Sequence, residues 1–291
     1  METAELLKKV RTIEIKTRGL CSDAFSGEYH SAFKGRGMSF SDVREYQPGD
    51  EIRSIDWNVT ARLNHPYVKV FEEERELSIM LLIDASRSMQ FGTVRAMKHE
   101  LISEISAVLA YSAIKNNDKV GIIFFTETIE KFIPPKKGRS HVLRIIRDLI
   151  DFKPSSAGTN IFAALHFLNN IMKKQSVVFL LSDFLNYGYD PMLRIASRKH
   201  DLVGIHVYDK RERELPDAGL SFFTDAETGK KVCIDTSDKS VRKEYGISFI
   251  ENLSRLKTTF LQSGAEMVSI STAENYIRAL MNFFVKRIHS N

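Results

Sequence analysis

The stretch that decides the fold is Leu77–Met89, which reads LSIMLLIDASRSM. Its first part, Leu77–Ile83, is of strand length and apolar apart from Ser78, with the continuous apolar run Ile79–Ile83, which is typical of a strand buried on both faces of a parallel sheet. The run ends in small oxygen-bearing side chains, Asp84, Ser86 and Ser88. The stretch therefore predicts a central strand that carries polar groups at its carboxyl end.

Strands and helices alternate along the chain after this stretch. Short apolar runs predict further strands, and apolar side chains at three- and four-residue steps predict the helices between them. The expected strands are Lys119–Thr126, Ser176–Ser182, Leu202–Tyr208 and Glu266–Ile270, with Ile129–Ile133 as an antiparallel edge strand and Leu220–Phe223 with Lys231–Ile234 as a hairpin. The expected helices are Thr93–Asn117, Ser140–Phe152, Thr159–Met172, Pro191–His200, Ser240–Ser263 and Asn275–Ile288. This alternation predicts an α/β fold with a doubly wound, mainly parallel sheet covered by helices.

The chain before this region has a different pattern and predicts an N-terminal β-rich segment over residues 1–75, followed by the α/β domain over 76–291. We expect a short helix over Met1–Lys16, a loop over the glycine-containing stretch Phe25–Gly37, and a turn at Gln47–Asp50. The expected strands here are Ile52–Ala61 and Tyr67–Phe71. Within the first of these strands lies Trp57, the single tryptophan, which we expect to pack in an interior, with a recognition surface formed with Asp56 as the alternative.

Five oxygen-bearing residues form the candidate site. Asp84, Ser86 and Ser88 follow the first strand, Thr159 precedes a predicted helix, and Asp183 follows the strand that ends at residue 182. In a doubly wound sheet these segments converge, because ligands bind outside the carboxyl ends of the strands where the strand order reverses. Hydroxyls and carboxylates are hard oxygen ligands, which suit Mg²⁺, with Mn²⁺ or Ca²⁺ as alternatives. The sequence thus predicts a metal site with one coordination position open.

This pattern resembles the metal-ion-dependent adhesion site of von Willebrand factor A domains. That family has D-x-S-x-S after the first strand, a threonine from a later loop and an aspartate after another strand, matched here by Asp84, Ser86, Ser88, Thr159 and Asp183. The resemblance implies a site that binds a partner's Glu or Asp carboxylate and catalyses nothing. Phe184 departs from the glycine that many members have after the last aspartate, which puts the closure of that loop in question.

A second resemblance covers roughly residues 33–90. The run GRGMSFSDVREYQPGDEIRSIDWNVTARLNHPYVKVFEEERELSIMLLIDASRSM is similar to the domain-of-unknown-function family fifty-eight. The matching positions are Tyr46, Pro48, Gly49, Asp50, Ile55, Asp56, Trp57, Ala61 and Arg62. Members of this family pair a β-rich segment with a von Willebrand A-like domain and are linked to MoxR-type AAA+ ATPases. The resemblance implies an adaptor or chaperone component that works with such an ATPase or its client.

Other function classes have weaker support. The sequence contains no G-x-x-x-x-G-K-[ST] loop for nucleotide hydrolysis and no G-x-S-x-G elbow. A metal-dependent phosphohydrolase or nuclease remains an alternative, because Asp84 and Asp183 could act as an acid–base pair. A purely structural metal site is a further one.

Charge and composition bear on partners and location. Lysine and arginine number 42 against 37 acidic residues, a net charge of +5, and the basic residues are scattered rather than gathered in a stripe. Nucleic-acid binding is therefore an alternative that we do not expect. No segment reaches the run of about 18 apolar residues that spans a bilayer. Because Cys21 and Cys233 also stand in no disulfide or metal spacing, we expect a cytoplasmic protein.

Overall fold

The computed structural model describes residues 23–33, 38–73, 76–93 and 96–290. The expected helix over Met1–Lys16 lies outside these residues. Contacts divide the described chain into a large unit, residues 23–32 with 78–290, and a small unit, residues 33–77. Residues 23–32 thus belong with the large unit, although they precede the predicted domain boundary.

The large unit is built on a six-stranded sheet in the order β10-β7-β6-β3-β4-β5. Its strands are β3 (Ser78–Asp84), β4 (Lys119–Phe125), β5 (Ile129–Lys136), β6 (Val177–Ser182), β7 (Asp201–Tyr208) and β10 (Glu266–Ser271). All neighbouring pairs are parallel except β4 and β5, so β5 is the antiparallel edge strand that the sequence predicts. This arrangement confirms the α/β fold with a mainly parallel sheet.

The strand order reverses between β3 and β6. From β3 the chain adds β4 and β5 on one side, and then returns to place β6, β7 and β10 on the other side. The two central strands are therefore neighbours in the sheet but are far apart in sequence. Ligands of such sheets bind at the carboxyl ends on either side of this point.

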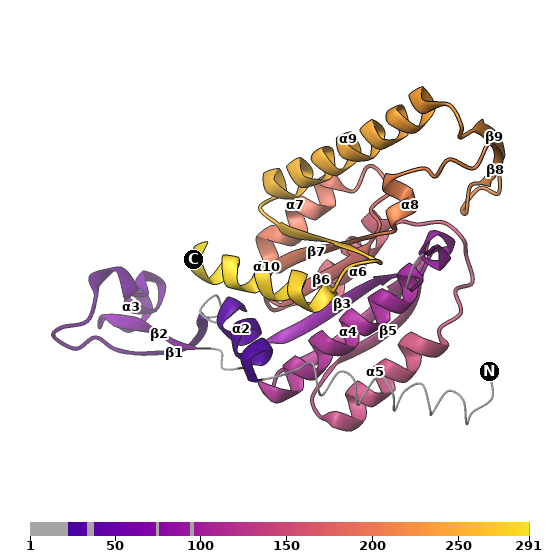
Figure 1. Ribbon diagram of the computed structural model, residues 1–291. Coiled ribbons are helices and arrows are strands. Elements are labelled where there is room, and N and C mark those ends of the chain that lie inside the picture. The colour runs from indigo at the N-terminus through magenta and orange to yellow at the C-terminus, as the bar shows by residue number, and fades with distance from the viewer. Residues whose placement is uncertain (1–22, 34–37, 74–75, 94–95, 291) are drawn as a thin grey trace. The chain divides into compact units, whose positions relative to one another are not determined.

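Helices cover both faces of the sheet (Figure 1). One face is covered by α6 (Ile161–Ile171), α7 (Asp190–Lys199) and α9 (Lys239–Ser263), which pack against Met80 and Leu82 in the core. The other face is covered by α4 (Lys98–Lys115), α5 (Arg139–Asp151), α10 (Tyr276–Ser290) and α2 (Asp23–Phe33). Successive side chains of a strand point to opposite faces, so an uninterrupted apolar run such as Ile79–Ile83 supplies both cores. None of the described helices is both long enough and apolar enough to cross a lipid bilayer.

Helix α2 replaces the loop that we expected over Phe25–Gly37, so that prediction is wrong within the described residues. Phe25, Tyr29 and Ala32 are buried at steps of four and three residues, which is the spacing of one helix face. The Phe25 and Tyr29 rings meet the Phe284 ring of α10 with centroids 5.6 and 5.7 Å away. The apolar spacing, and not the glycine content, determines the structure here.

The small unit pairs β1 (Met38–Glu45) with β2 (Tyr67–Glu73) in an antiparallel ribbon. The turn predicted at Gln47–Asp50 is confirmed, since the Asp50 N–H donates to the Gln47 carbonyl at 3.0 Å and Gly49 has a φ of +113°. Strand β2 confirms the strand expected at Tyr67–Phe71. Its partner β1 comes from residues before the turn, where the sequence analysis predicted no strand.

The strand expected over Ile52–Ala61 is wrong. These residues form a 3₁₀ turn, η1 (Ile52–Ser54), and a helix, α3 (Trp57–Leu63). Asp56 caps α3, and its Oδ1 accepts from the Asn58 and Val59 amides at 2.9 and 3.2 Å. These amides therefore bond to the cap and not to a neighbouring strand. Trp57 is 66% exposed, which also contradicts the expected burial of its side chain.

The chain between β7 and α9 forms a short helix and a hairpin outside the central sheet. After the short helix α8 (Lys210–Arg213), strands β8 (Leu220–Thr224) and β9 (Lys231–Asp235) pair in an antiparallel sheet of their own. This hairpin confirms the sequence prediction. Helix α4, by contrast, begins five residues later than expected, at Lys98, where Glu100 accepts from the Met97 amide at 3.0 Å.

Candidate metal site

The three predicted loops meet at the carboxyl edge of the sheet, at the point where the strand order reverses. Asp84 is the last residue of β3, and Asp183 directly follows β6, the strand paired with β3. The Arg87 amide donates to the Ala157 carbonyl at 3.0 Å, which joins the first loop to the second. Asn186 Nδ2 donates to the Thr159 carbonyl at 2.7 Å, which joins the third loop to the second. These bonds hold the three segments side by side.

Asp84 is a buried carboxylate that accepts bonds on both oxygens. Oδ1 accepts from the Ser86 amide at 3.0 Å, and Oδ2 accepts from the Ser182 hydroxyl at 2.6 Å. The pKa of Asp84 is raised to about 7, first because burial removes water and second because the negative charge of Asp183 is near. Two carboxylates are thus forced close together, and a bound cation would relieve the repulsion between them.

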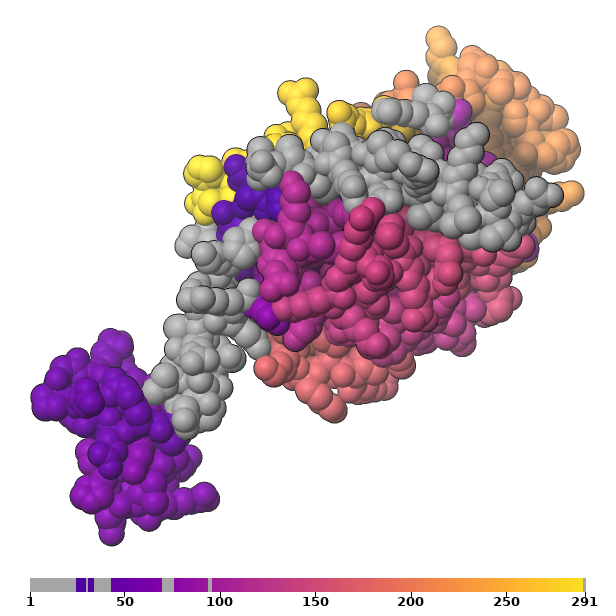
Figure 2. Space-filling model, turned by 90° about the horizontal axis from the view of Figure 1, so that it is seen from below, coloured from indigo at the N-terminus to yellow at the C-terminus, as the bar shows by residue number. Residues whose placement is uncertain are grey.

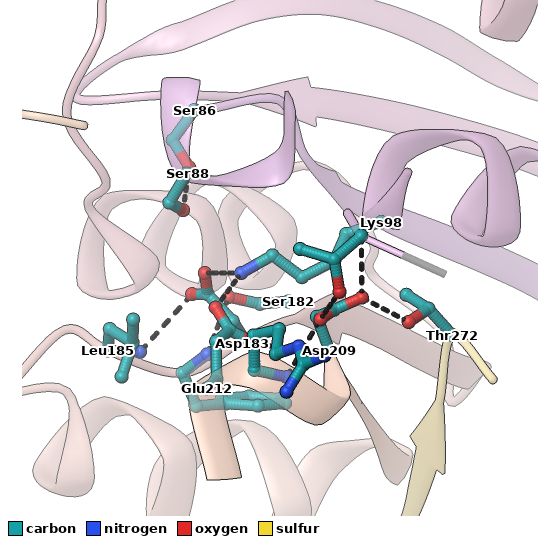
Figure 3. A network of polar contacts seen from close by, with 12 residues as sticks. Ser86, Ser88, Lys98, Ser182, Asp183, Leu185, Asp209, Glu212 and Thr272 are labelled. Carbon is teal, nitrogen blue, oxygen red and sulfur yellow. Dashed lines mark hydrogen bonds and ion pairs between the residues drawn. The ribbon is translucent and has the colours of Figure 1, made fainter. Parts of the chain in front are cut away.

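Ser86 and Ser88 contribute adjacent hydroxyls from the first loop. Both side chains are buried, and their Oγ atoms lie 3.1 Å apart. Figure 3 shows the two serines on one side of the pair formed by Asp183 and Lys98. The D-x-S-x-S spacing therefore places two hydroxyls close together beside the carboxylates.

Asp183 is paired with a buried lysine that the sequence analysis did not include. Lys98 Nζ donates to Asp183 Oδ2 at 2.8 Å and to Glu212 Oε1 at 2.6 Å, and the lysine side chain is fully buried (Figure 3). Burial alone would lower the pKa of Lys98, but the two carboxylates outweigh this effect and raise it, so the group stays an ammonium. The second oxygen of Asp183 accepts from the Leu185 amide at 3.3 Å.

Thr159 lies in the second loop, but its hydroxyl is directed at another carboxylate. Thr159 Oγ1 donates to Glu227 Oε1 at 2.9 Å, and Glu227 lies in the turn of the β8–β9 hairpin. The structure therefore brings the five predicted residues to one edge of the sheet and adds Lys98, Glu212 and Glu227 to them.

The charges at this edge do not balance. In the part of the chain that the structure describes, Asp183 interacts electrostatically with three other carboxyl groups, those of Asp84, Glu212 and Glu227, and forms an ion pair with one ammonium, that of Lys98. His206 adds no positive charge at neutral pH, because burial lowers its pKa to about 4. The residues present therefore fit a cation that prefers oxygen ligands. Among the described residues, no group of three or more His, Cys, Asp and Glu side chains is placed to hold a metal, so the candidate ligands are mainly hydroxyls.

Phe184 shows how the third loop closes without the glycine that many von Willebrand A domains have. Its φ is +55°, a left-handed conformation that is unfavourable for a bulky residue. The ring is buried and meets the Phe260 ring edge-to-face, with centroids 5.2 Å apart. The Phe184 amide donates to the Ser182 hydroxyl at 3.0 Å, and that hydroxyl in turn donates to Asp84. Packing thus holds the strained residue that orients the site.

A cavity of about 740 Å³ lies beside these groups. Its lining includes Ser88 and Asp183 at the edge of the sheet, aromatic residues such as Tyr208 and Phe249, and hairpin residues 223–228. The site thus lies next to a space large enough to take a side chain from another molecule.

Comparison with known proteins places the chain among proteins of unknown function. It is 26% identical over 290 residues to the uncharacterized protein Rv1480 of Mycobacterium tuberculosis, which covers 99% of this chain and 91% of that protein. It is 29% identical over 107 residues to the uncharacterized protein YeaD of Bacillus subtilis, over 37% of this chain and 25% of that protein.

Among solved structures, the conserved hypothetical protein BatB of Bacteroides thetaiotaomicron is similar with a TM-score of 0.49 and 16% identity, over 74% of this chain and all of that one. A family model described as "Protein of unknown function DUF58" matches residues 42–252, which include most of the small unit, β3, β6 and the hairpin. The chain therefore belongs to the DUF58 family.

Proposed function

We propose that this protein is a metal-dependent protein–protein interaction module and not an enzyme. It acts as an adaptor or chaperone component with a MoxR-type AAA+ ATPase, the partner class that the family resemblance implies. One observation supports it most: hydroxyls and an excess of carboxylates meet at the point where the strand order reverses.

The residues that would hold the ion are Asp84, Ser86, Ser88, Thr159 and Asp183. Mg²⁺ is the proposed ion, with Mn²⁺ or Ca²⁺ as alternatives. When bound, it supplies a positive charge with a replaceable water, and a partner's Glu or Asp can take the place of that water. Such charge-assisted contacts contribute about 1.5–3 kcal/mol each.

Neighbouring groups position these ligands. The Ser182 hydroxyl fixes the orientation of Asp84, and the Lys98 ammonium fixes that of Asp183. The Asn186 amide holds the backbone of the Thr159 loop. A rigid set of ligands lowers the cost of ordering them when the partner binds.

The charge of the site favours this function over a phosphohydrolase or nuclease and over nucleic-acid binding. Phosphoesters and nucleic acids are anionic, and four carboxyl groups line the cavity, those of Asp183, Glu212, Asp225 and Glu227, against the one guanidinium of Arg211. A partner with one carboxylate meets less repulsion than a polyanion does. We also propose a cytoplasmic location. Cys233 is a free thiol, which is the state expected of cysteines in a reducing compartment.

Thermal denaturation with and without Mg²⁺ tests metal binding. Mg²⁺ at 100 times its dissociation constant should stabilise the wild-type protein by about 2.7 kcal/mol. Ser86→Ala should lose most of this gain. The matched control is Ser112→Ala, which removes a buried hydroxyl of α4 that donates to the Val108 carbonyl at 2.9 Å, far along the chain from the loops. It should lower stability but keep the gain from Mg²⁺.

A retention experiment tests the partner. The full chain is immobilised and offered a purified MoxR-type ATPase in Mg²⁺ or in EDTA. Retention in Mg²⁺, lost in EDTA and in Ser86→Ala, supports the proposal. Equal retention under all three conditions would refute metal-dependent binding.

A further inference from the structure

The turn of the β8–β9 hairpin places a carboxylate of this chain on the candidate metal site. Glu227 Oε1 accepts from the hydroxyl of Thr159 at 2.9 Å, across 68 positions of sequence. Thr159 is one of the five proposed ligands. Glu227 also lies close enough to Asp183 for the negative charge of each to affect the other. A carboxylate next to these ligands has the chemistry that the proposed function assigns to a partner.

The turn is built to present Glu227 in this direction. Asp225 Oδ1 accepts from the Glu227 amide at 3.2 Å, from the Thr228 amide at 2.6 Å and from the Thr228 hydroxyl at 2.6 Å. Gly229 follows with a φ of +71°, and its amide donates to the Asp225 carbonyl at 2.9 Å. These bonds fix the backbone of the turn, so that the direction of the Glu227 side chain is set locally.

Like charges surround this contact. The Glu227 carboxylate lies near the carboxylates of Asp183, Asp225 and Glu127, which repel it, while the Thr159 hydroxyl donates to its Oε1 at 2.9 Å. A positive ion among these carboxylates would turn this repulsion into attraction. The arrangement of the hairpin is therefore explained best by a cation that Glu227 helps to bind.

The β8–β9 hairpin has few bonds to the rest of the large unit that would prevent it from moving away from the candidate metal site. Among the described residues, its two strands pair only with each other, and an isolated two-stranded ribbon has marginal stability. Phe222 and Val232 are 76% and 54% exposed. The orange atoms of the hairpin and of the adjoining part of α9 form one end of the large unit in Figure 2. At its base, the Thr236 amide donates to the Gly219 carbonyl at 2.9 Å, so movement can begin beyond this pair.

We infer that Glu227 is an internal carboxylate ligand of the metal site, and that a partner's carboxylate binds by displacing it. This inference rests on the proposed function. In the closed state the Thr159 hydroxyl holds the Glu227 carboxylate beside the proposed ligands, where it would add a ligand to the bound ion. In the open state the hairpin has moved away, and the cavity beside Asp183 accepts the side chain of the partner.

The test uses the full chain with Mn²⁺ as the metal and acetate as the carboxylate. Electron paramagnetic resonance measures Mn²⁺ binding, and the relaxation of the acetate methyl protons measures acetate bound next to the protein-held Mn²⁺. Glu227→Gln keeps the size of the side chain and removes its charge. The matched control, Glu214→Gln, removes the charge of an exposed glutamate whose neighbour Arg213 lies 3.7 Å away.

Two opposite changes are expected in Glu227→Gln. Mn²⁺ binding weakens by about tenfold, because the site loses one charged ligand. Acetate binding to the Mn²⁺-loaded protein strengthens by about tenfold, because the closed state no longer competes with it. Glu214→Gln matches the wild type in both measurements. In the wild type, acetate also speeds amide hydrogen exchange at residues 220–235 when Mn²⁺ is present, and has no effect in EDTA.

The outcomes separate this inference from the proposed function. If wild type and Glu227→Gln bind Mn²⁺ and acetate equally, Glu227 is no ligand and the inference is overturned, while the metal site stands. If the wild-type protein binds no Mn²⁺, the proposed function fails and the inference fails with it.

Discussion

Replacing Lys98 by methionine tests whether one buried ammonium stabilises the carboxylates of the site. The Lys98 side chain is fully buried and bonds to Asp183 at 2.8 Å and to Glu212 at 2.6 Å. Methionine fills a similar volume without the charge. Each hydrogen bond to a charged group contributes about 1.5–3 kcal/mol, so two give roughly 3–6 kcal/mol. Breaking a buried ion pair by removing one partner costs about 3–5 kcal/mol, in agreement with this sum.

The assay is urea denaturation in EDTA, followed by circular dichroism. We expect Lys98→Met to lose about 3–5 kcal/mol of unfolding free energy, a large part of the 5–15 kcal/mol typical of a domain. Lys131→Met is the matched control, because this half-exposed lysine also has a carboxylate partner, Asp148, at 3.0 Å. Solvent screens that pair, so the control should lose only about 0–1 kcal/mol.

Adding Mg²⁺ extends this prediction to the metal. A bound divalent cation replaces the missing positive charge, so Mg²⁺ should stabilise Lys98→Met more than it stabilises the wild type. Two results would contradict the reasoning: a loss below about 1 kcal/mol in EDTA, or an equal gain from Mg²⁺ in both proteins. The first would mean that Lys98 does not compensate the carboxylates, and the second that the metal does not act on the same charges.

Three further changes probe the fold around the site. His200 is buried, its ring nitrogens have no hydrogen-bond partner among the described residues, and burial lowers its pKa to about 4. Its neutral ring therefore contributes fully to the unfolding free energy above pH 6.5, and this contribution falls by about 3 kcal/mol as the pH falls towards 4. Because burial lowers the pKa of His206 in the same way, chemical denaturation should find the acid loss of His200→Phe smaller than that of the wild type by about 3 kcal/mol. A Cβ at Gly204 would lie 2.4 Å from the buried Phe260 ring, so Gly204→Ala should lower the unfolding free energy in urea by about 1–3 kcal/mol. Gly246 lies within helix α9, and the atom nearest to an added Cβ there is 3.6 Å away, so Gly246→Ala should raise the unfolding free energy slightly. Asp209 accepts four hydrogen bonds where three loops meet, and Asp209→Asn should lower the unfolding free energy by about 1–3 kcal/mol in thermal denaturation; an unchanged melting temperature would show that these bonds contribute little.

The sheet could be predicted because its signals are local. Runs such as Ile79–Ile83 are apolar on both faces, and only a strand covered on both sides buries them all. Asp84 and Asp183 could be placed together because parallel strands carry their carboxyl ends to one edge. The strand expected at Ile52–Ala61 failed because Asp56, a side chain that caps a helix, outweighs the preference of the β-branched residues after it.

The position of Lys98 in its helix is a sequence signal for a buried ion pair. In α4 the buried residues Leu101, Ile102 and Ile105 follow Lys98 at steps of three, four and seven. A lysine in the apolar stripe of a helix has to find a buried carboxylate, because an unpaired buried charge is very unfavourable. Glu227 has no such signal, since its contact with Thr159 depends on how the hairpin folds back over the sheet edge.

Lys98 and Glu227 act on the same charges in opposite ways. Without Lys98, the carboxylates around Asp183 would repel each other in a buried place, and the fold would lose stability before any metal arrived. With a second ammonium, the site would have too little negative charge to attract a divalent ion. One lysine leaves the site stable but still negative, and Glu227 adds a carboxylate that can be exchanged. It follows that Lys98→Met should tighten Mg²⁺ binding, whereas Glu227→Gln should weaken it. Calorimetric titration measures both affinities. If both variants shift the affinity in the same direction, general disruption of the site explains the result and the opposite roles of Lys98 and Glu227 are refuted.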